Sequence, residues 1–280
     1  MSKMINTAIY GGTFDPVHIG HIDVAKAVLE EGAADEVVFM PNYVSPFKQN
    51  EVHSSGVDRM NMIKEATRDI EHVYVSTYEL NREGPSYTIE TLEEMEKSLG
   101  GKVSFILGAD SLLTLETWYR GSEIIKNYRI IAVHRPDVDY SETKRAVNLY
   151  KRKYSADVIL LKTIPHDVSS TEIRKKVNQN EKIKGLVTQA VAEYIESHNL
   201  YANLYEINDK LTKIMKSKIS KKRFIHSIGV ADMAKKLARI YGEDPDKAYF
   251  AGYVHDIAKC LSIEEANRLV RYYGLGGKYL

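Results

Sequence analysis

Two histidines stand three residues apart near the start of the chain, directly after a pair of glycines. They close the string Gly11–Gly12–Thr13–Phe14–Asp15–Pro16–Val17–His18–Ile19–Gly20–His21. On the first turn of a helix, residues three apart share one face, so both imidazoles can reach the same ligand. Paired glycines permit a tight turn, and the free N–H groups of a helix N-terminus attract anions. The string therefore predicts a site for the phosphates of a nucleotide, with Gly20 leaving room for it.

A second stretch has the residues of a helix start: Ser169–Ser170–Thr171–Glu172–Ile173–Arg174. Serine and threonine at an N-cap expose hydroxyls and backbone amides, while Arg174, one turn further on, supplies a planar cationic fork. By itself this pattern is also an ordinary capping box. Together with the first string it predicts the second half of a triphosphate site.

Elements of an α/β fold must hold these motifs. Between residue 5 and about residue 163, short β-rich runs alternate with segments of helical period, which is typical of βαβ units around a parallel sheet. The expected strands are 7–10, 36–40, 73–77, 103–107, 130–133 and 158–161. The expected helices include 19–31, 57–70, 88–99, 171–177 and 188–198. Each strand leads into a loop at the sheet edge where open α/β sheets bind ligands.

The strand signal stops near Ala202. Beyond it, residues 204–216, 221–241, 245–259 and 263–273 all have the pattern of helices. The sequence thus predicts two domains, an α/β domain over residues 1–201 and a small all-α appendage over residues 202–280.

Composition narrows the class of protein. With 44% hydrophobic and 28% charged residues the chain is an ordinary globular protein, and a net charge of +1 argues against broad capture of nucleic acid or anionic membrane. Cys260, the only cysteine, cannot form an internal disulfide. No apolar run approaches the roughly 18 residues of a membrane span, and the first residues have no signal-peptide pattern. We expect a cytoplasmic protein; its oligomeric state stays open.

The string that ends at His21 resembles the signature of the His-x-Gly-His nucleotidyltransferase superfamily, although members commonly have a proline where this chain has Val17. From about Met4 to Leu200 the chain resembles bacterial nicotinate-nucleotide adenylyltransferases, a likeness also carried by residues 85–92 and by Gly108–Ala109–Asp110–Ser111 through Trp118–Tyr119. The resemblance implies a Rossmann-like doubly wound parallel sheet. It also implies transfer of the adenylyl group of ATP to nicotinate mononucleotide, giving nicotinate adenine dinucleotide and pyrophosphate in NAD biosynthesis.

The resemblance further implies which residues act. The ATP-binding residues would be Gly11, Gly12, Thr13, Phe14, His18, His21, Lys48, Gly108, Asp110, Ser169, Ser170, Thr171 and Arg174, with His18, His21 and Arg174 catalytic. The nicotinate mononucleotide would contact Tyr87, Thr88, Asp110, Trp118 and Tyr119, with Trp118 stacked on the pyridinium ring. The attacking phosphate is already mostly dianionic at neutral pH, so we expect no catalytic base. Mg²⁺ should be held mainly by ATP oxygens and water.

The helical appendage carries a second resemblance. Arg223–Phe224–Ile225–His226–Ser227–Ile228–Gly229–Val230 and Tyr253–Val254–His255–Asp256–Ile257–Ala258–Lys259 resemble the start of HD-type hydrolases that cleave diadenosine tetraphosphate. This implies His226, His255 and Asp256 as ligands of iron or another transition metal. Such domains close their site with a later aspartate and further histidines, and this sequence has none after Asp256. We expect a partial HD-type domain that is structural or weakly metal-binding rather than hydrolytic.

Other functions stay open at this point. The first domain could serve nicotinamide mononucleotide or pantetheine phosphate, act as a cytidylyltransferase, or sense nucleotides without turning them over. Nicotinate presents a carboxylate where nicotinamide presents an amide, so the substrate choice rests on the segments around Thr88 and Trp118. Lys218–Ile219–Ser220–Lys221–Lys222 superficially resembles a class I aminoacyl-tRNA synthetase motif, but it falls in the helical appendage and no basic surface for tRNA is present. No P-loop is present.

Overall fold

The computed structural model describes residues 5–42, 54–82, 87–134, 138–202, 204–265 and 268, with the backbone alone for residues 204–210 and 260. The chain divides into two compact units, Met1–Tyr201 and Ala202–Leu280. Each unit has a hydrophobic core of its own, and each is described by itself below.

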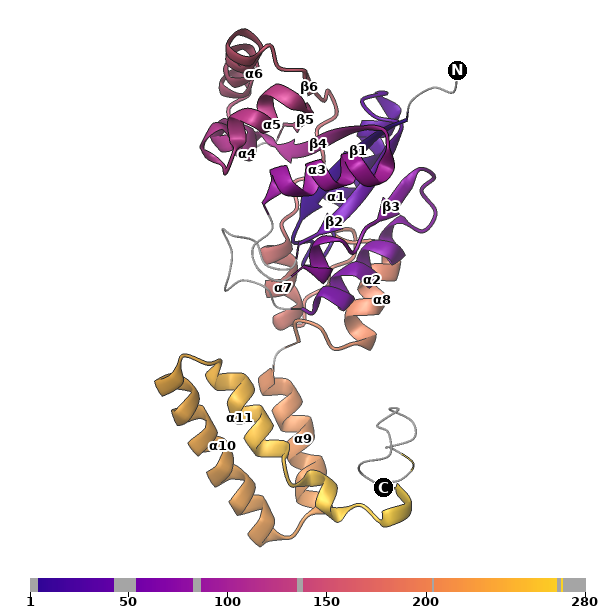
Figure 1. Ribbon diagram of the computed structural model, residues 1–280. Coiled ribbons are helices and arrows are strands. Elements are labelled where there is room, and N and C mark those ends of the chain that lie inside the picture. The colour runs from indigo at the N-terminus through magenta and orange to yellow at the C-terminus, as the bar shows by residue number, and fades with distance from the viewer. Residues whose placement is uncertain are drawn as a thin grey trace. The chain divides into compact units, whose positions relative to one another are not determined.

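A parallel sheet forms the centre of the first unit (Figure 1). Its strands are β1 (Asn6–Gly12), β2 (Glu36–Pro41), β3 (Val73–Val75), β4 (Lys102–Gly108), β5 (Arg129–Val133) and β6 (Val158–Leu160). Within the described residues they run in the order β3-β2-β1-β4-β5-β6, and each neighbouring pair is parallel. All the expected strands are confirmed, as is the doubly wound, Rossmann-like α/β class.

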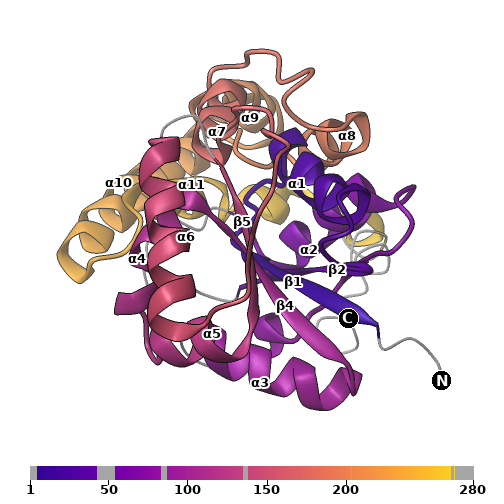
Figure 2. The ribbon, with the colours of Figure 1, turned by 90° about the horizontal axis from the view of Figure 1, so that it is seen from above.

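Helices cover both faces of this sheet (Figure 2). One layer holds α1 (Ile19–Glu30), α2 (Gly56–Thr67), α7 (Ser170–Asn178) and α8 (Gln189–Ser197). The other holds α3 (Thr88–Leu99), α4 (Ala109–Thr114), α5 (Gly121–Asn127) and α6 (Tyr140–Tyr154). Side chains alternate along each strand, so Ala8 and Tyr10 enter one core while Ile9 enters the other. Two short 3₁₀ helices, η1 (Glu79–Asn81) and η2 (Leu115–Thr117), complete the connections.

Three helices of the second layer were not among those expected from the sequence. The helices α4 and α5 have six and seven residues, too few to display a helical period. The longer α6 is strongly charged, and its buried stripe consists only of Thr143, Val147 and Tyr150. Polar and charged residues fill most of its other positions, so the overall hydrophobicity of α6 is low although its few apolar residues do follow helical spacing.

The strand order has a topological switch point between β1 and β4. These strands are neighbours in the sheet, with Ile9 opposite Phe105, although more than 80 residues of chain separate them. From this pair the chain builds outward through β2 and β3 on one side and through β5 and β6 on the other. Open α/β sheets bind ligands outside the carboxyl ends of the strands at such a point. Gly12 and Gly108, where β1 and β4 end, mark that place here.

The second unit is helical in its described part, as expected. It contains α9 (Leu204–Lys218), α10 (Lys221–Tyr241), α11 (Pro245–Val254) and the 3₁₀ helix η3 (Ile257–Cys260). Met215, Ile219, Ala231 and Tyr253 form its small core. The helices α10 and α11 approach closely, because a Cβ on Gly252 would lie 2.8 Å from the Cα of Ala231.

One expectation about the second unit is wrong. Residues 245–259 do not form a single helix: α11 ends at Val254, and a turn at His255 and Asp256 leads into η3. The Nδ1 of His255 bonds the carbonyl oxygen of Gly252, and the Asp256 carboxylate is buried beside Lys259, so side-chain contacts stabilise the break. The helix expected over 263–273 lies largely outside the described residues. Among the described helices, none has the length and apolar character to cross a membrane.

Candidate active site

A cavity of about 850 Å³ lies at the ends of β1 and β4, at the switch point. It is lined by nearly every residue that the sequence assigned to the nucleotides. These are Gly11, Gly12, Thr13, Phe14, His18, His21, Tyr87, Thr88, Gly108, Asp110, Trp118, Tyr119, Ser169, Ser170, Thr171 and Arg174. The remaining predicted residue, Lys48, lies outside the described residues. Motifs spread over more than 160 positions thus meet around one cavity.

The two histidines lie together, as their spacing predicted. His18 is the N-cap of α1 and His21 belongs to its first turn, and their rings stack with centroids 3.6 Å apart. The backbone N–H of His18 donates to Nδ1 of His21 at 3.2 Å. Because Nδ1 of His21 accepts this bond, a neutral His21 carries its proton on Nε2. Its Nε2–H is then a donor suited to a phosphate oxygen.

Gly20 has a steric role that the sequence did not indicate. A Cβ at this position would lie 2.7 Å from the carbonyl oxygen of His166 and 3.3 Å from the ring of His18. The space left by the missing side chain is therefore occupied by the segment before α7, which approaches α1 there. Glycine at position 20 lets the two phosphate motifs come together rather than simply leaving room for a nucleotide.

The carboxylate of Asp15 is buried in the turn between β1 and α1, with only 2% of the residue exposed. Its Oδ1 accepts hydrogen bonds from the hydroxyls of Ser54 and Tyr201, the latter at 2.6 Å. Burial, together with the nearby charge of Asp15, raises the pKa of Tyr201 well above its ordinary value. The Tyr201 phenol therefore stays protonated and remains a donor to Asp15.

Arg59 holds the backbone of the same turn from the other side. The side chain comes from α2 and is fully buried; its Nη1 and Nη2 donate to the carbonyl oxygens of Thr13 and Asn42, both at 2.8 Å. Burial lowers the pKa of Arg59, and the charge of Asp15 opposes that shift. A buried guanidinium with two carbonyl partners and a nearby carboxylate fixes the turn rigidly.

The helix α7 contributes the second phosphate motif. Ser169 is its N-cap and accepts the backbone N–H of Glu172 at 3.1 Å, while Ser170 donates to the carbonyl oxygen of Pro16 at 2.9 Å. Arg174 donates from Nη1 to the carbonyl oxygen of Asp15 at 2.7 Å. The guanidinium of Arg174 is thus seated on the same turn that leads to His18 and His21.

The opposite end of the cavity is aromatic. The rings of Tyr87 and Tyr119 contact each other with centroids 4.6 Å apart, and the half-buried Trp118 lies 6.3 Å from the ring of Phe105. Thr88 is the first residue of α3 and also lines the cavity. A flat aromatic surface suits a planar ring, and a helix N-terminus suits an anionic group on that ring.

Asp110 stands at the carboxyl end of β4, in the first turn of α4. The N-cap of α4 is Gly108, and no side chain caps that terminus. Asp110 is the acidic residue of the first turn of α4 and also lines the cavity wall, where its carboxylate is compatible with ribose hydroxyls as partners.

In the second unit, three potential metal ligands form a cluster. One ligand atom each from His226, His255 and Asp256 lie within 4.8 Å of one another. The Nδ1 of His255 is paired with the carbonyl oxygen of Gly252 at 2.7 Å, and its Nε2 lies 3.2 Å from Oδ1 of Asp256, so Nε2 is the ring atom that faces the cluster. Lys259 holds the pKa of Asp256 below its usual range, and both imidazoles add to this effect. The donor set therefore fits a divalent transition metal.

Comparison with known proteins identifies the first unit. Residues 9–176 match the family described as cytidylyltransferase-like. A probable nicotinate-nucleotide adenylyltransferase of Caldicellulosiruptor bescii is 36% identical over 197 residues, covering 70% of this chain and 99% of that relative. A protein of the same description from Dehalococcoides mccartyi is 37% identical over 204 residues, covering 70% of this chain and 97% of its own length.

The chain belongs to the nicotinate-nucleotide adenylyltransferase family. A solved structure of Plasmodium falciparum nicotinic acid mononucleotide adenylyltransferase, complexed with APC, has the same fold, with a TM-score of 0.57 at 20% identity over 70% of this chain and 97% of that one. Its complex with NaAD gives a TM-score of 0.58. Residues 223–275 match the HD domain, so this member of the adenylyltransferase family is fused to an HD region.

Three residues that hold the site together were missed from the sequence: Ser54, Arg59 and Tyr201. The burial of Arg59 could have been predicted from the sequence, because Arg59 precedes the apolar Met62 and Ile63 by three and four residues and so falls on the buried face of α2. No local sequence pattern predicts the roles of Ser54 and Tyr201. Their role depends on a hydrogen bond to Asp15, which lies 39 and 186 residues away in the sequence.

We predict that Tyr201→Phe destabilises the first unit by about 2 kcal/mol, because a buried carboxylate loses a donor that water cannot replace. Urea unfolding of the full chain, followed by the fluorescence of Trp118, measures this. The single tryptophan reports on the first unit alone. Tyr74→Phe, at a half-exposed tyrosine of β3, is the control and should leave the midpoint unchanged. Equal midpoints for the two variants would contradict the role given to Tyr201.

Proposed function

We propose that residues 1–201 of this chain join nicotinate mononucleotide to the adenylyl group of ATP, releasing pyrophosphate and forming nicotinate adenine dinucleotide. The observation that carries the proposal is the two-ended cavity. His18, His21 and Arg174 line it from α1 and α7, on one face of the sheet, and Trp118 and Thr88 line it from segments on the other face. The names of the curated relatives support the same reaction.

The phosphate end would bind ATP through fixed donors. We assign His18 and His21 to the α- and β-phosphates, and Arg174 to the β- and γ-phosphates, with Lys48 assisting. Arg174 donates from Nη1 to the Asp15 carbonyl oxygen and from Nη2 to the Thr171 hydroxyl. Its guanidinium has further N–H groups that can donate to phosphate oxygens. Donors held by the protein before the reaction do not need to reorganise when charge develops on the transferring and leaving groups.

The chemical step needs orientation more than proton transfer. A phosphate oxygen of the mononucleotide attacks the α-phosphorus in line with the departing pyrophosphate, and that oxygen is already deprotonated at neutral pH. The chain would accelerate this step by holding both reactants in one cavity and by donating hydrogen bonds from His18 and His21. The Asp15 carboxylate is engaged by Ser54 and Tyr201, so Mg²⁺ would arrive with ATP and keep water ligands.

The aromatic end would bind the pyridine ring. The Trp118 indole can stack on the cationic pyridinium, and the ribose hydroxyls can bond to Asp110. The N-terminus of α3, with Tyr87 as N-cap and Thr88 as its first residue, offers the backbone N–H groups of a first helical turn and the positive end of the helix dipole. An anionic carboxylate gains from both features and a neutral amide gains less, which favours nicotinate over nicotinamide.

A direct assay tests the function. The full chain is incubated with ATP, Mg²⁺ and either nicotinate or nicotinamide mononucleotide, and dinucleotide and pyrophosphate are measured. We expect dinucleotide from nicotinate mononucleotide. If nicotinamide mononucleotide also reacts, its kcat/KM should be lower by about tenfold or more. Saturating nicotinate mononucleotide should also quench Trp118 fluorescence. Nucleotide binding without product would instead support a sensor.

We predict that His21→Ala lowers kcat by about a hundredfold, as expected for loss of one preorganised phosphate donor. The variant should remain folded with a slightly lower melting temperature, because it loses the hydrogen bond from the His18 N–H and the ring contact with His18 but the His21 ring is partly exposed. His72→Asn is the control: His72 is exposed, has a φ of 62°, which asparagine tolerates, and does not line the cavity. Unchanged kcat in His21→Ala would exclude the assignment of His21.

We further propose that the second unit binds a divalent transition metal, such as iron, through His226, His255 and Asp256. With three ligands the binding should be weak, and removing one should lower the affinity by about tenfold or more. Calorimetric titration of the full chain with Co²⁺ measures this in the parent, in His255→Ala and in the control His198→Ala, at an exposed histidine of the first unit. Equal affinities in the parent and His255→Ala would contradict the site.

A further inference from the structure

The aromatic end of the cavity has two walls that come from different segments. One is the start of α3, with Tyr87 and Thr88; the other is the segment between η2 and α5, with Trp118 and Tyr119. The ring contact between Tyr87 and Tyr119 is where the walls meet at the cavity. Any ligand that inserts beside Trp118 depends on the distance and angle between these walls.

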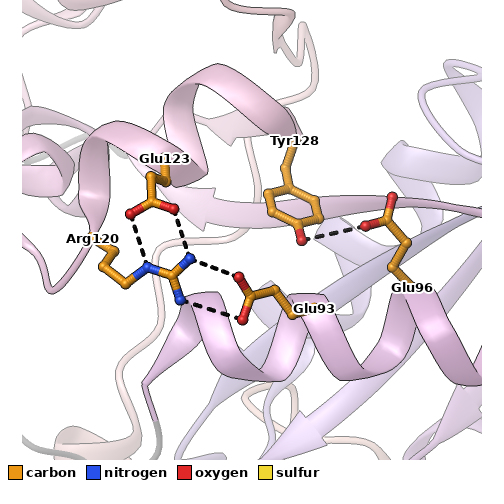
Figure 3. Close-up of polar contacts among 5 residues, drawn as sticks. All are labelled: Glu93, Glu96, Arg120, Glu123 and Tyr128. Atoms are coloured by element: carbon orange, nitrogen blue, oxygen red, sulfur yellow. Dashed lines mark hydrogen bonds and ion pairs between the residues drawn. The ribbon is translucent and has the colours of Figure 1, made fainter.

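Arg120, the next residue after these aromatic side chains, ties the second wall to the first (Figure 3). Its Nη1 and Nη2 donate to both carboxylate oxygens of Glu93 on α3, at 3.3 and 2.7 Å. Its Nε and Nη2 donate to both carboxylate oxygens of Glu123 on α5, at 2.9 and 2.6 Å. One turn further along α3, Glu96 accepts the hydroxyl of Tyr128 at 3.5 Å. The guanidinium thus links the middle of α3 to the first turn of α5, which begins two residues after Tyr119.

The planar fork of arginine is essential to this bridge. A guanidinium can serve two carboxylates with paired N–H groups at once, whereas the point charge of a lysine cannot reproduce both geometries. The hydrogen bonds that Arg120 donates to Glu123 and Glu93 raise its pKa further above its already high value. Arg120 therefore stays a cation at every pH at which the protein is folded.

The backbone at this point needs support. Arg120 has a φ of 52°, in the left-handed region that side chains other than glycine rarely occupy. The next residue, Gly121, is packed so tightly that a Cβ would lie 2.0 Å from the carbonyl oxygen of Leu115. A strained residue of this kind persists when its surroundings hold it in place. The two ion pairs supply that restraint on the turn that presents Trp118.

We propose that Arg120 is a positioning residue that sets the geometry of the pyridine end of the cavity by bracing the Trp118–Tyr119 wall against α3. This inference rests on the proposed function, because it assigns the pyridine ring to Trp118. Arg120 does not itself line the cavity, so it acts through its neighbours. Its influence falls on the mononucleotide and not on ATP, whose phosphates lie at the opposite end.

The test compares steady-state kinetics of the full chain in Arg120→Gln, Glu93→Gln, the double variant and Arg120→Lys. We expect each single Gln variant to raise KM for nicotinate mononucleotide about fivefold, as loss of a well-ordered ion pair allows. KM for ATP should stay within about twofold of the parent value. The double variant should be no worse than Arg120→Gln alone, because both changes break one interaction. Arg120→Lys keeps the positive charge but loses the planar guanidinium. Its KM for nicotinate mononucleotide should therefore still show more than half of the rise seen in Arg120→Gln.

Arg129→Gln is the matched control. It breaks the Arg129–Asp157 ion pair, which has a 2.7 Å contact and comparable exposure but lies at the start of β5, away from the cavity. We expect parental KM values for both substrates in this variant. Acrylamide quenching of Trp118 should be stronger in Arg120→Gln than in Arg129→Gln, since a loosened wall exposes the indole.

The outcomes separate the two proposals. If the parent makes no dinucleotide, the proposed function fails. If the parent is active and both Gln variants keep the parental KM for nicotinate mononucleotide, the role of Arg120 is wrong and the function stands. A rise in KM that is equal for ATP and the mononucleotide, or equal quenching in all variants, would also overturn the role of Arg120. If Arg120→Gln does not fold, Glu93→Gln and Arg120→Lys give the same comparison.

Discussion

The turn from Thr13 to Pro16 carries a buried carboxylate and carbonyl oxygens that must all find donors within the protein. Arg59, Ser170 and Arg174 donate to its carbonyls, while Ser54 and Tyr201 donate to the Asp15 carboxylate. An unpaired charge or carbonyl at this depth would cost several kcal/mol. The donors come from α2, from α7 and from the end of the first unit. The phosphate end of the cavity is therefore complete only when the whole first unit has folded.

The two ends of the cavity are stabilised by different physics. The end proposed to bind phosphates depends on hydrogen bonds to one turn, and most of their donors are buried, as Ser54 and Arg59 are, or lie in α7. The aromatic end is closer to solvent and depends on ring contacts and on two half-exposed ion pairs of Arg120, one with Glu93 of α3 and one with Glu123 in the first turn of α5. Exposed pairs are individually weak, so this end has less resistance to deformation. The first end suits a constant chemical step, and the softer end suits entry and selection of the second substrate.

The second unit shows how a break in regular structure can gather ligands. A continuous helix over residues 245–259 would put His255 and Asp256 on adjacent positions about 100° apart around the axis, on different faces. The turn after Val254 instead brings both toward His226 on α10, with their ligand atoms within 4.8 Å. The close contact between Gly252 and Ala231 holds α11 against α10 and so fixes this arrangement. The match of residues 223–275 to the HD domain agrees with the cluster.

The sequence by itself determined the strands, the doubly wound class and the change to helices near residue 202, and it picked out the two motifs that line the cavity, because hydrophobic period and helix-capping chemistry act over a few residues. It also indicated the aromatic residues around Trp118. Only the tertiary structure decided that Ser54, Arg59 and Tyr201 converge on one turn, that Gly20 admits the His166 carbonyl, and that Arg120 bridges α3 and α5. These contacts join residues distant in the chain, and nothing in the local spacing encodes which buried donor will meet which acceptor.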